Sequence, residues 1–404
     1  MPHPLTSFPT GFLWGAATAA HQTEGNNVNT DSWMAENAVP PRFAERSGDA
    51  CDSYHRWPDD LDIVRDLGLG AYRFSIEWAR VEPEPGHFSQ AEIAHYSRMV
   101  QGCLERGITP VVTLHHFSSP RWFRRDGAWT SASAADRFAR YVEAVLPALD
   151  GVHWICTINE PNMVAMAEAR LSAEQHVPAA PGVPALSDEA FEGLASAHRA
   201  AREVLAALPG VRSGWTVANQ NVTAVDGADE LADRVRNSVD DRFLDVGRSD
   251  DFIGVQAYSR MLIGPDGLRK ATASRQTQMG WEFYPAALAE AVRHTAARVG
   301  DVPILVTENG IATPDDSERI EYTQLALEGL RAAMEDGIDV RGYLHWSLLD
   351  NYEWGSWDAT FGLVAVDRTD FRRTVKSSGR WYGQVAQTNG AILSESDQTA
   401  GALR

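Results

Sequence analysis

The feature that most constrains the fold is an alternation, repeated eight times, of a short apolar stretch with a longer helical one. Strands are expected over 12–16, 71–76, 109–114, 153–158, 213–217, 251–255, 304–307 and 342–346. Helices are expected over 58–67, 90–105, 133–149, 189–208, 231–246, 285–299 and 319–335. Strands that alternate with helices form parallel sheets. Eight such units predict an α/β fold of one (β/α)8 TIM barrel.

The 404 residues contain no stretch that would divide the chain into two domains. Barrels often run long as single domains. We therefore expect one domain over residues 1–390, followed by a frayed C-terminal tail over 391–404, which is polar and rich in alanine. The chain is expected to loosen after Pro161, with a proline-rich loop over 179–188 across the barrel mouth and a second loop over 264–280.

The formal net charge of −19 argues against nucleic acid or an anionic membrane as a partner, because both require basic surface. Three sparse cysteines (Cys51, Cys103 and Cys156) are expected to be reduced, which predicts a cytoplasmic location. The N-terminus has no signal-peptide pattern, and no apolar run reaches the ~18 residues that a membrane helix needs.

The carboxyl end of every expected strand carries a polar or aromatic residue, which is hard to attribute to packing. These residues are Gln22, Arg73, His116, Asn159, Glu160, Asn219, Gln256, Tyr258, Glu308 and Trp346. In a parallel barrel the carboxyl ends of the strands meet at one edge, where chemistry takes place. We therefore interpret this edge as the functional site.

Two of these residues, Glu160 and Glu308, are candidates for a catalytic pair, since glycoside hydrolysis needs two carboxyl groups that flank one bond. Arg73 is expected to hold one of the two ionised, and Tyr258 could donate a hydrogen bond to it. The other carboxyl group would face that charge, so its pKa would rise. Asn159 could bind a sugar hydroxyl beside the reacting carbon.

The pair His115-His116 raises the alternative of a metal-dependent barrel hydrolase. Adjacent residues of a strand point to opposite faces, so both cannot easily bind one ion. We expect His116 to contact sugar, His115 to face packing or solvent, and no metal or cofactor to be needed. Trp14, Trp78, Trp122 and Trp154 are expected in the core, and Arg124-Arg125 in a solvated turn.

Several motifs in the correct order resemble glycoside hydrolase family 1, the β-glucosidase family. They are residues 8–9, 12–18 and 22–25, then 72–78, 157–161 and 306–310, and finally 346–354 and 361–364. They span nearly the whole chain, which makes the resemblance far more specific than the single motif Asn159-Glu160-Pro161, a combination that occurs widely.

The resemblance implies a retaining double displacement by an exo-acting β-glycosidase that releases a β-linked sugar from the non-reducing end of an oligosaccharide or glycoside. It implies Glu308 as the nucleophile and Glu160 as the acid/base, with Arg73 and Tyr258 positioning Glu308 and Asn159 holding the 2-hydroxyl. The positions that match those of the sugar site are Gln22, His116, Trp346, Glu353 and Trp354, and Gln256 is counted with them as substrate-binding.

The chain departs from the family at Gln256, where the family has Asn, at Phe117, where it commonly has Trp, and over 355–360. These changes leave open the sugar (glucose, galactose, fucose or xylose), the aglycone and the oligomeric state. Glu353 is expected to repel a 6-phosphate. A transglycosidase using the same intermediate is one alternative. A non-catalytic sugar-binding relative is the other, although it would be expected to lack one of the two acids.

Overall fold

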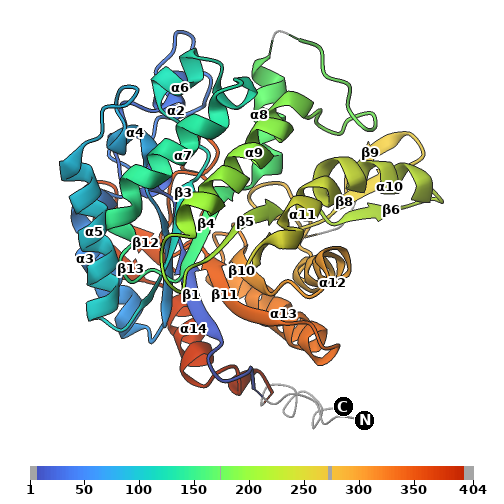
Figure 1. Cartoon of the computed structure of the whole chain (residues 1–404). Coiled ribbons are helices and arrows are strands. Elements are labelled where there is room, and N and C mark those ends of the chain that lie inside the picture. The colour runs from blue at the N-terminus through green and yellow to red at the C-terminus, as the bar shows by residue number, and fades with distance from the viewer. Residues whose placement is uncertain (1–6, 173, 272–274, 395–404) are drawn as a thin grey trace.

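Eight parallel strands close into a barrel in this computed structural model, which describes residues 7–172, 174–271 and 275–394 (Figure 1). The strands are β1 Leu13–Ala17, β2 Ala71–Ser75, β3 Thr109–His115, β4 Trp154–Asn159, β5 Arg212–Ala218, β7 Ile253–Gln256, β10 Ile304–Asn309 and β11 Val340–Trp346. Their order around the barrel is β1-β11-β10-β7-β5-β4-β3-β2. All eight expected strands are present, so the predicted fold class is confirmed.

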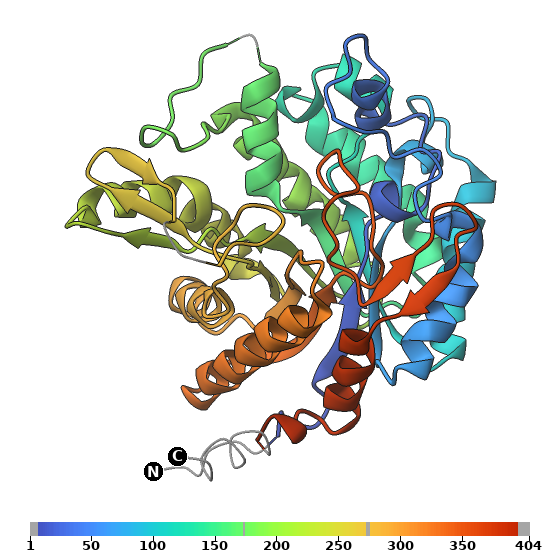
Figure 2. The same cartoon turned by 180° about the vertical axis from the view of Figure 1, so that it is seen from behind.

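Helices surround the barrel, as the two opposite views show (Figures 1 and 2). The long ones are α3 Ser53–Asp66, α5 Gln90–Glu105, α7 Ala134–Val145, α9 Asp188–Leu205, α12 Ala287–Val299 and α13 Asp316–Glu335. Helix α5 has the expected bounds, while α3 begins five residues earlier than expected and carries Pro58 inside it. Helix α14 Ser377–Gln387 and the hairpin of β12 Val364–Val366 with β13 Arg373–Val375 were not expected.

The prediction that the chain loosens after Pro161 was wrong, because helix α8 Pro161–Leu171 begins at that proline. Proline suits the first position of a helix, since the N–H it lacks would have no partner there in any case. The prolines that do lie in irregular backbone belong to residues 174–187, before α9.

Two other expected segments differ in detail. The helix expected over 231–246 is α10 Asp229–Arg236, a π-helical turn η3 Asn237–Asp241 and α11 Arg242–Val246. The loop expected over 264–280 contains β9 Gly267–Arg269, which joins β8 Met261–Gly264 and β6 Val222–Ala224 in a small sheet. Residues 272–274 of that loop lie outside the described residues.

The four tryptophans expected in the core are all buried. The prediction of a solvated turn was wrong for Arg124, which lies in helix α6 Arg121–Arg125. Its guanidinium forms an ion pair of 2.6 Å with Glu168 on α8 and a longer one with Asp31. Arg125 is exposed, as expected. The error follows from the missing helix, since nothing then placed Glu168 near Arg124.

The predicted domain limit at residue 390 stays a prediction. Of the expected tail, residues 391–394 are described and Leu393 is buried, whereas residues 395–404 lie outside the described part. None of the described helices is both long enough and apolar enough to cross a lipid bilayer.

Candidate active site

Glu160 and Glu308 lie at the carboxyl ends of two barrel strands, as the sequence predicted. Glu308 belongs to β10, and Glu160 follows β4 directly and precedes α8. Both residues are buried, since Glu160 is 6% exposed and Glu308 is 4% exposed. Each carboxyl group therefore depends on neighbouring protein groups for its charge state.

Glu308 is held by two donors, one that follows the adjacent strand β7 and one from β2, which is not adjacent to β10 in the barrel. Arg73 on β2 is fully buried and forms an ion pair with one carboxylate oxygen of Glu308. The Tyr258 hydroxyl, just after β7, donates to the other oxygen at 2.7 Å. The expected contacts of Arg73 and Tyr258 with one of the two acids are therefore present, and that acid is Glu308. Arg73 is itself oriented by donating to Thr113 at 3.0 Å.

Asn159 is fixed by three donors that reach the same side-chain oxygen. Arg73 Nη2 donates at 2.5 Å, Gln256 Nε2 at 2.8 Å and Thr216 Oγ1 at 3.2 Å. The Asn159 Nδ2 group and the Gln256 Oε1 atom are buried without a partner among the described residues. One donor and one acceptor are thus left for a ligand, and hydroxyl groups can use both.

Three of the residues with left-handed backbone follow strands at this edge of the barrel. Glu160 has φ of 45°, and its N–H donates to the Thr216 carbonyl at 2.7 Å. Phe117 and Trp354, whose rings lie 5.2 Å apart, also have positive φ. Left-handed backbone costs a non-glycine residue about 1–3 kcal/mol and often marks functional sites.

The environments of the two acids differ in the expected direction. Burial raises the pKa of Glu160 well above its usual range, and the charges of Glu308 and Glu353 raise it further. Burial also raises the pKa of Glu308, but Arg73 and Tyr258 oppose that shift. Burial is the largest influence on the pKa of Glu308, and that Arg73 holds this glutamate ionised stays a prediction. Of the two carboxyl groups, Glu160 is the one more readily protonated.

The other expected sugar-binding residues lie around a third buried carboxyl group, Glu353. Trp346 Nε1 donates to Glu353 at 2.9 Å, and the His116 ring stacks on Trp346 with ring centres 5.8 Å apart. Gln22 donates to Asn351 at 3.0 Å, whereas Trp354 is 52% exposed. Burial and Arg73 hold the pKa of His116 well below its usual range, so its ring is neutral.

Burial raises the pKa of Glu353 to about 8, and the charge of Glu308 adds to the rise. A pKa this far above the usual value makes the protonated form of this carboxyl group accessible near pH 7. That Glu353 repels a 6-phosphate stays a prediction, and the raised pKa would weaken the repulsion. The neutral group can donate as well as accept a hydrogen bond.

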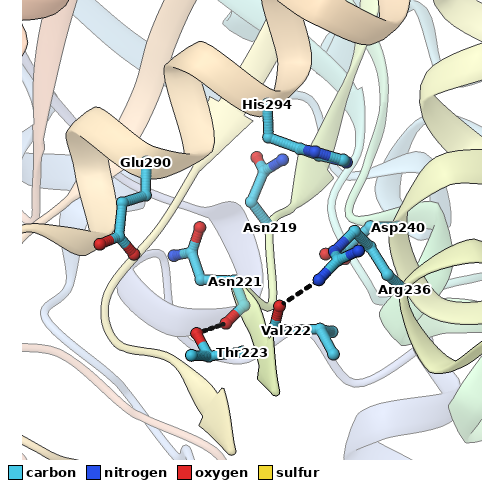
Figure 3. Close-up of a pocket in the computed structure, with 8 residues that line it drawn as sticks. All are labelled: Asn219, Asn221, Val222, Thr223, Arg236, Asp240, Glu290 and His294. Carbon is cyan, nitrogen blue, oxygen red and sulfur yellow. Dashed lines mark hydrogen bonds between the residues drawn. The ribbon is translucent and has the colours of Figure 1, made fainter. Parts of the chain in front are cut away.

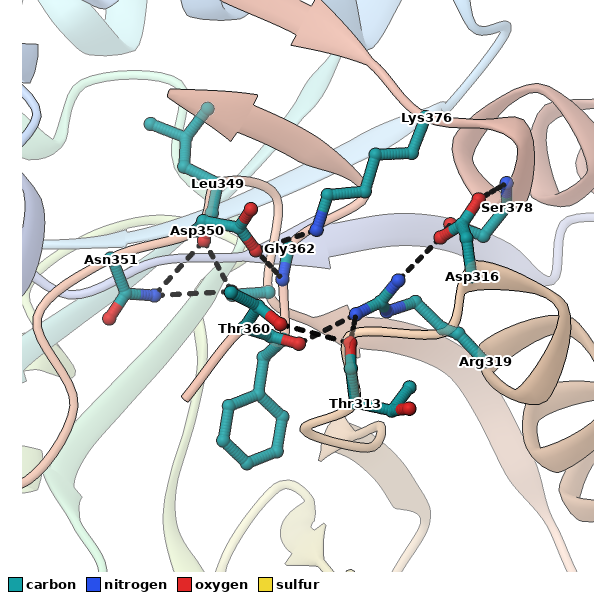
Figure 4. Close-up of polar contacts among 12 residues, drawn as sticks. Thr313, Asp316, Arg319, Leu349, Asp350, Asn351, Thr360, Gly362, Lys376 and Ser378 are labelled. Carbon is teal, nitrogen blue, oxygen red and sulfur yellow. Dashed lines mark hydrogen bonds and ion pairs between the residues drawn. The ribbon is translucent and has the colours of Figure 1, made fainter. Parts of the chain in front are cut away.

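A polar network outside the barrel braces the loop that carries Glu353 (Figure 4). Arg319 on α13 is buried, and its Nη2 donates to the carbonyls of Thr313 at 2.8 Å and Thr360 at 2.6 Å, while its Nη1 pairs with Asp316. Asp350 accepts from Lys376 at 2.8 Å. Two loops at the barrel edge are thus tied to helix α13 and to Lys376, the residue before helix α14.

Sequence reasoning missed several residues that orient the site. Thr113 and Thr216 bond to Arg73 and Asn159, and Asn351 bonds to Gln22. Asn351 stands two residues before Glu353 in a motif that the sequence had already singled out, so it could have been found. The two threonines lie inside strands and carry no comparable signal. His115, expected to face packing or solvent, packs against Trp129.

A (β/α)8 barrel with two buried glutamates at its carboxyl edge, one of them held by arginine and tyrosine, defines the class as O-glycoside hydrolases. The model of Glycosyl hydrolase family 1 matches residues 5–209 and 249–391. The chain therefore belongs to glycosyl hydrolase family 1.

Characterised relatives resemble the chain over almost their whole length. The bifunctional β-D-glucosidase/β-D-fucosidase of Bifidobacterium breve is 33% identical over 93% of this chain and 97% of its own. β-Glucosidase A of Thermotoga maritima is 30% identical over 96% and 99%.

Two solved structures also resemble the chain over almost their whole length. The β-glycosidase BGL167 has a TM-score of 0.88 at 43% identity, covering 94% of this chain and 97% of that one. The Thermotoga maritima β-glucosidase in complex with glucoimidazole has a TM-score of 0.87 at 28% identity, covering 96% and 100%.

Proposed function

We propose that the chain is a retaining, exo-acting β-glycosidase that releases a sugar from the non-reducing end of a β-glycoside or oligosaccharide. The observation that carries this proposal is the asymmetry of the two carboxyl groups. Glu308 is bound by Arg73 and Tyr258, while the pKa of Glu160 is raised by burial and by nearby negative charge. A nucleophile and a proton donor need these two different environments.

In the first step, Glu308 attacks the anomeric carbon, the bond to the aglycone oxygen breaks, and Glu160 gives its proton to that oxygen. In the second step, Glu160 removes a proton from water, which attacks the anomeric carbon and releases Glu308. Two inversions give net retention. Arg73 and Tyr258 orient Glu308 towards the anomeric carbon. They also stabilise the Glu308 carboxylate when its bond to the sugar is broken.

The free Asn159 Nδ2 group is proposed to hold the 2-hydroxyl, and Gln256 Oε1 lies on the same amide network. Gln22, His116, Trp346 and Glu353 are proposed to bind the other hydroxyls. The exposed Trp354 ring offers a flat surface for the apolar side of a sugar.

The names of the relatives favour glucose or fucose as the sugar, because both are β-linked substrates of the Bifidobacterium breve enzyme by its name. A cytoplasmic location is supported by Cys51, Cys103 and Cys156, all free and buried.

Hydrolysis of p-nitrophenyl β-D-glucoside and β-D-fucoside, followed by proton NMR during the first minutes, tests the proposal. The first anomer released is expected to be β, which then equilibrates to the α/β mixture. Initial release of the α anomer would show inversion and contradict the double displacement. A panel of nitrophenyl glycosides in the same assay identifies the preferred sugar.

A further inference from the structure

A second polar cavity of about 210 Å³ lies between helix α12 and the segment from the end of β5 to η3 (Figure 3). Asn219, Asn221, Val222, Thr223, Arg236 and Asp240 line it from that segment, and Glu290 and His294 line it from α12. Asn219 follows β5 and was expected at the functional edge, but its side chain is directed to α12, where it donates to Thr295 at 3.1 Å.

Most of this cavity is built from a part of the chain that the family model leaves unmatched. The match stops at residue 209 and resumes at residue 249, and the six residues from Asn219 to Asp240 all lie in that gap. The segment also contains the π-helical turn η3, a rare element that often occurs at functional sites. Glu290 and His294, which line the cavity from α12, lie in the matched part of the chain.

An unsatisfied buried acceptor faces the cavity. Asn219 is 5% exposed, and its Nδ2 group donates to Thr295 at 3.1 Å. Its Oδ1 atom has no hydrogen-bond partner among the residues that the structure describes. Figure 3 shows the Asn219 amide between the side chains of Glu290 and His294. Because a buried acceptor without a partner is costly, it points to a ligand that donates a hydrogen bond.

The contacts of the basic side chains around the cavity disfavour an anion. Both already have acidic partners, since Arg236 pairs with Asp233 at 2.5 Å and His294 Nε2 lies 2.6 Å from an Asp241 oxygen. The carboxyl groups of Asp240 and Glu290 also line the cavity, where Asp240 accepts from the Gln220 N–H and Glu290 accepts from the Tyr284 hydroxyl. Burial raises the pKa of Asp240 to about 7. A phosphate or carboxylate would meet a surface of acceptors and acids.

The lining also disfavours a metal ion and an apolar ligand. Within residues 7–172, 174–271 and 275–394, no group of three or more His, Cys, Asp or Glu side chains could hold a metal. Val222 is the single aliphatic side chain among the eight lining residues. The volume is below the ~300–1,000 Å³ of sites for drug-sized ligands, so the occupant is small.

We propose that this cavity binds a neutral polyhydroxylated ligand of about monosaccharide size. One ligand hydroxyl donates to Asn219 Oδ1, and others meet Asn221 and Glu290. A hydroxyl donates and accepts at once, which matches a lining of amides, carboxyl groups and Thr223. The cavity shares no lining residue with the proposed sugar site, and binding there is independent of the proposed glycosidase mechanism.

Calorimetric titration of the full chain with D-glucose tests the proposal, with D-galactose, inorganic phosphate and spermidine as parallel probes. Crystals soaked in glucose locate the bound sugar. We expect sugar in the cavity and a binding event whose affinity falls at least 10-fold in two variants. Asn219→Leu removes the free acceptor, and Thr223→Trp fills the space while leaving Asn219 unchanged.

Gln101→Leu, on the exposed face of α5, is the control and should bind glucose as the wild type does. Melting temperatures establish that each variant is folded. Any binding at the barrel edge persists in both cavity variants, so failure of the proposed function and failure of this site are distinguishable. An empty cavity in soaked crystals, glucose binding unchanged in Thr223→Trp, or phosphate or spermidine bound there in place of sugar would overturn the proposal.

Discussion

Glu160, Glu308 and Glu353 are the same residue type in three different surroundings. Glu308 has a guanidinium and a phenol as partners, Glu353 has the Trp346 indole, and Glu160 has nearby negative charges. Burial raises the pKa of all three, so the partners decide how far each one shifts. The proposed roles of Glu160 as acid/base and Glu308 as nucleophile therefore follow from these partners and not from the residue type.

The raised pKa of Glu353 predicts that the free energy of unfolding depends on pH. Its pKa is about 8 in the folded chain and 4.5 ordinarily, so folding favours the protonated form. The stability it contributes is complete below about pH 4.5 and is lost as the pH rises towards 8, by an amount on the order of a few kcal/mol. Glu353→Gln should therefore lose less stability than the wild type between pH 5 and pH 8.

Urea denaturation at a series of pH values measures this difference, with Glu84→Gln, at an exposed position, as the control. Parallel curves for Glu353→Gln and the wild type would show that Glu353 does not titrate in this range.

At the scale of elements, the barrel edge is held by contacts that reach around the ends of the strands. The Arg319 guanidinium binds carbonyls in the loops after β10 and β11 and pairs with Asp316 (Figure 4). Similarly, Asn162 on α8 donates to the carbonyls of Ala218 at 2.7 Å and Val239 at 2.9 Å, which fixes the start of the helix that follows Glu160.

Arg319→Leu is expected to cost about 3–5 kcal/mol, because Asp316 and two carbonyls lose a buried partner. The matched control is Arg293→Leu, whose exposed pair with Asp336 should be worth about 0–1 kcal/mol. Thermal denaturation compares the two, and kinetics should show a higher KM for Arg319→Leu because the loop of Glu353 loosens. Equal costs for both variants would mean that the network does not brace the loop.

The strands and most helices could be predicted because apolar periodicity and turn residues are local signals. Helix α8 was missed because a proline followed by a proline-rich segment resembles a loop, although the first proline starts the helix. A contact of Arg73 with one of the two acids was expected because all three residues lie at the same edge of the barrel, while the choice of Glu308 came from the family resemblance. The pKa of Glu353 could not be predicted, since it depends on how many groups bury it, and these come from distant parts of the chain.

On the scale of the whole molecule, the fold depends on closing the barrel where its first strand meets its last. β1 lies between β11 and β2, and Gly15 pairs with Leu344 on one side and Ala71 on the other. A Cβ atom at Gly15 would lie 2.3 Å from the Ala71 carbonyl oxygen and 2.7 Å from Leu344. Only glycine allows the strands to approach this closely.

Gly15→Ala should therefore destabilise the chain by about 1–3 kcal/mol or more, since backbone has to move to admit the methyl group. Gly70→Ala is the control, because the nearest atom to its added Cβ is 4.0 Å away, and it should change stability by less than about 0.5 kcal/mol. Chemical denaturation of both variants measures this. A Gly15→Ala variant as stable as the wild type would contradict the closure.

The most direct test of the central claim is the anomer formed when azide rescues each glutamate variant acting on 2,4-dinitrophenyl β-D-glucoside. If Glu308 is the nucleophile and Glu160 the acid/base, Glu308→Ala with azide gives the α-glycosyl azide, because azide attacks the substrate once. Glu160→Ala gives the β-glycosyl azide, because azide attacks the intermediate on Glu308. The reverse assignment of anomers, or full activity of either variant without azide, would contradict the account.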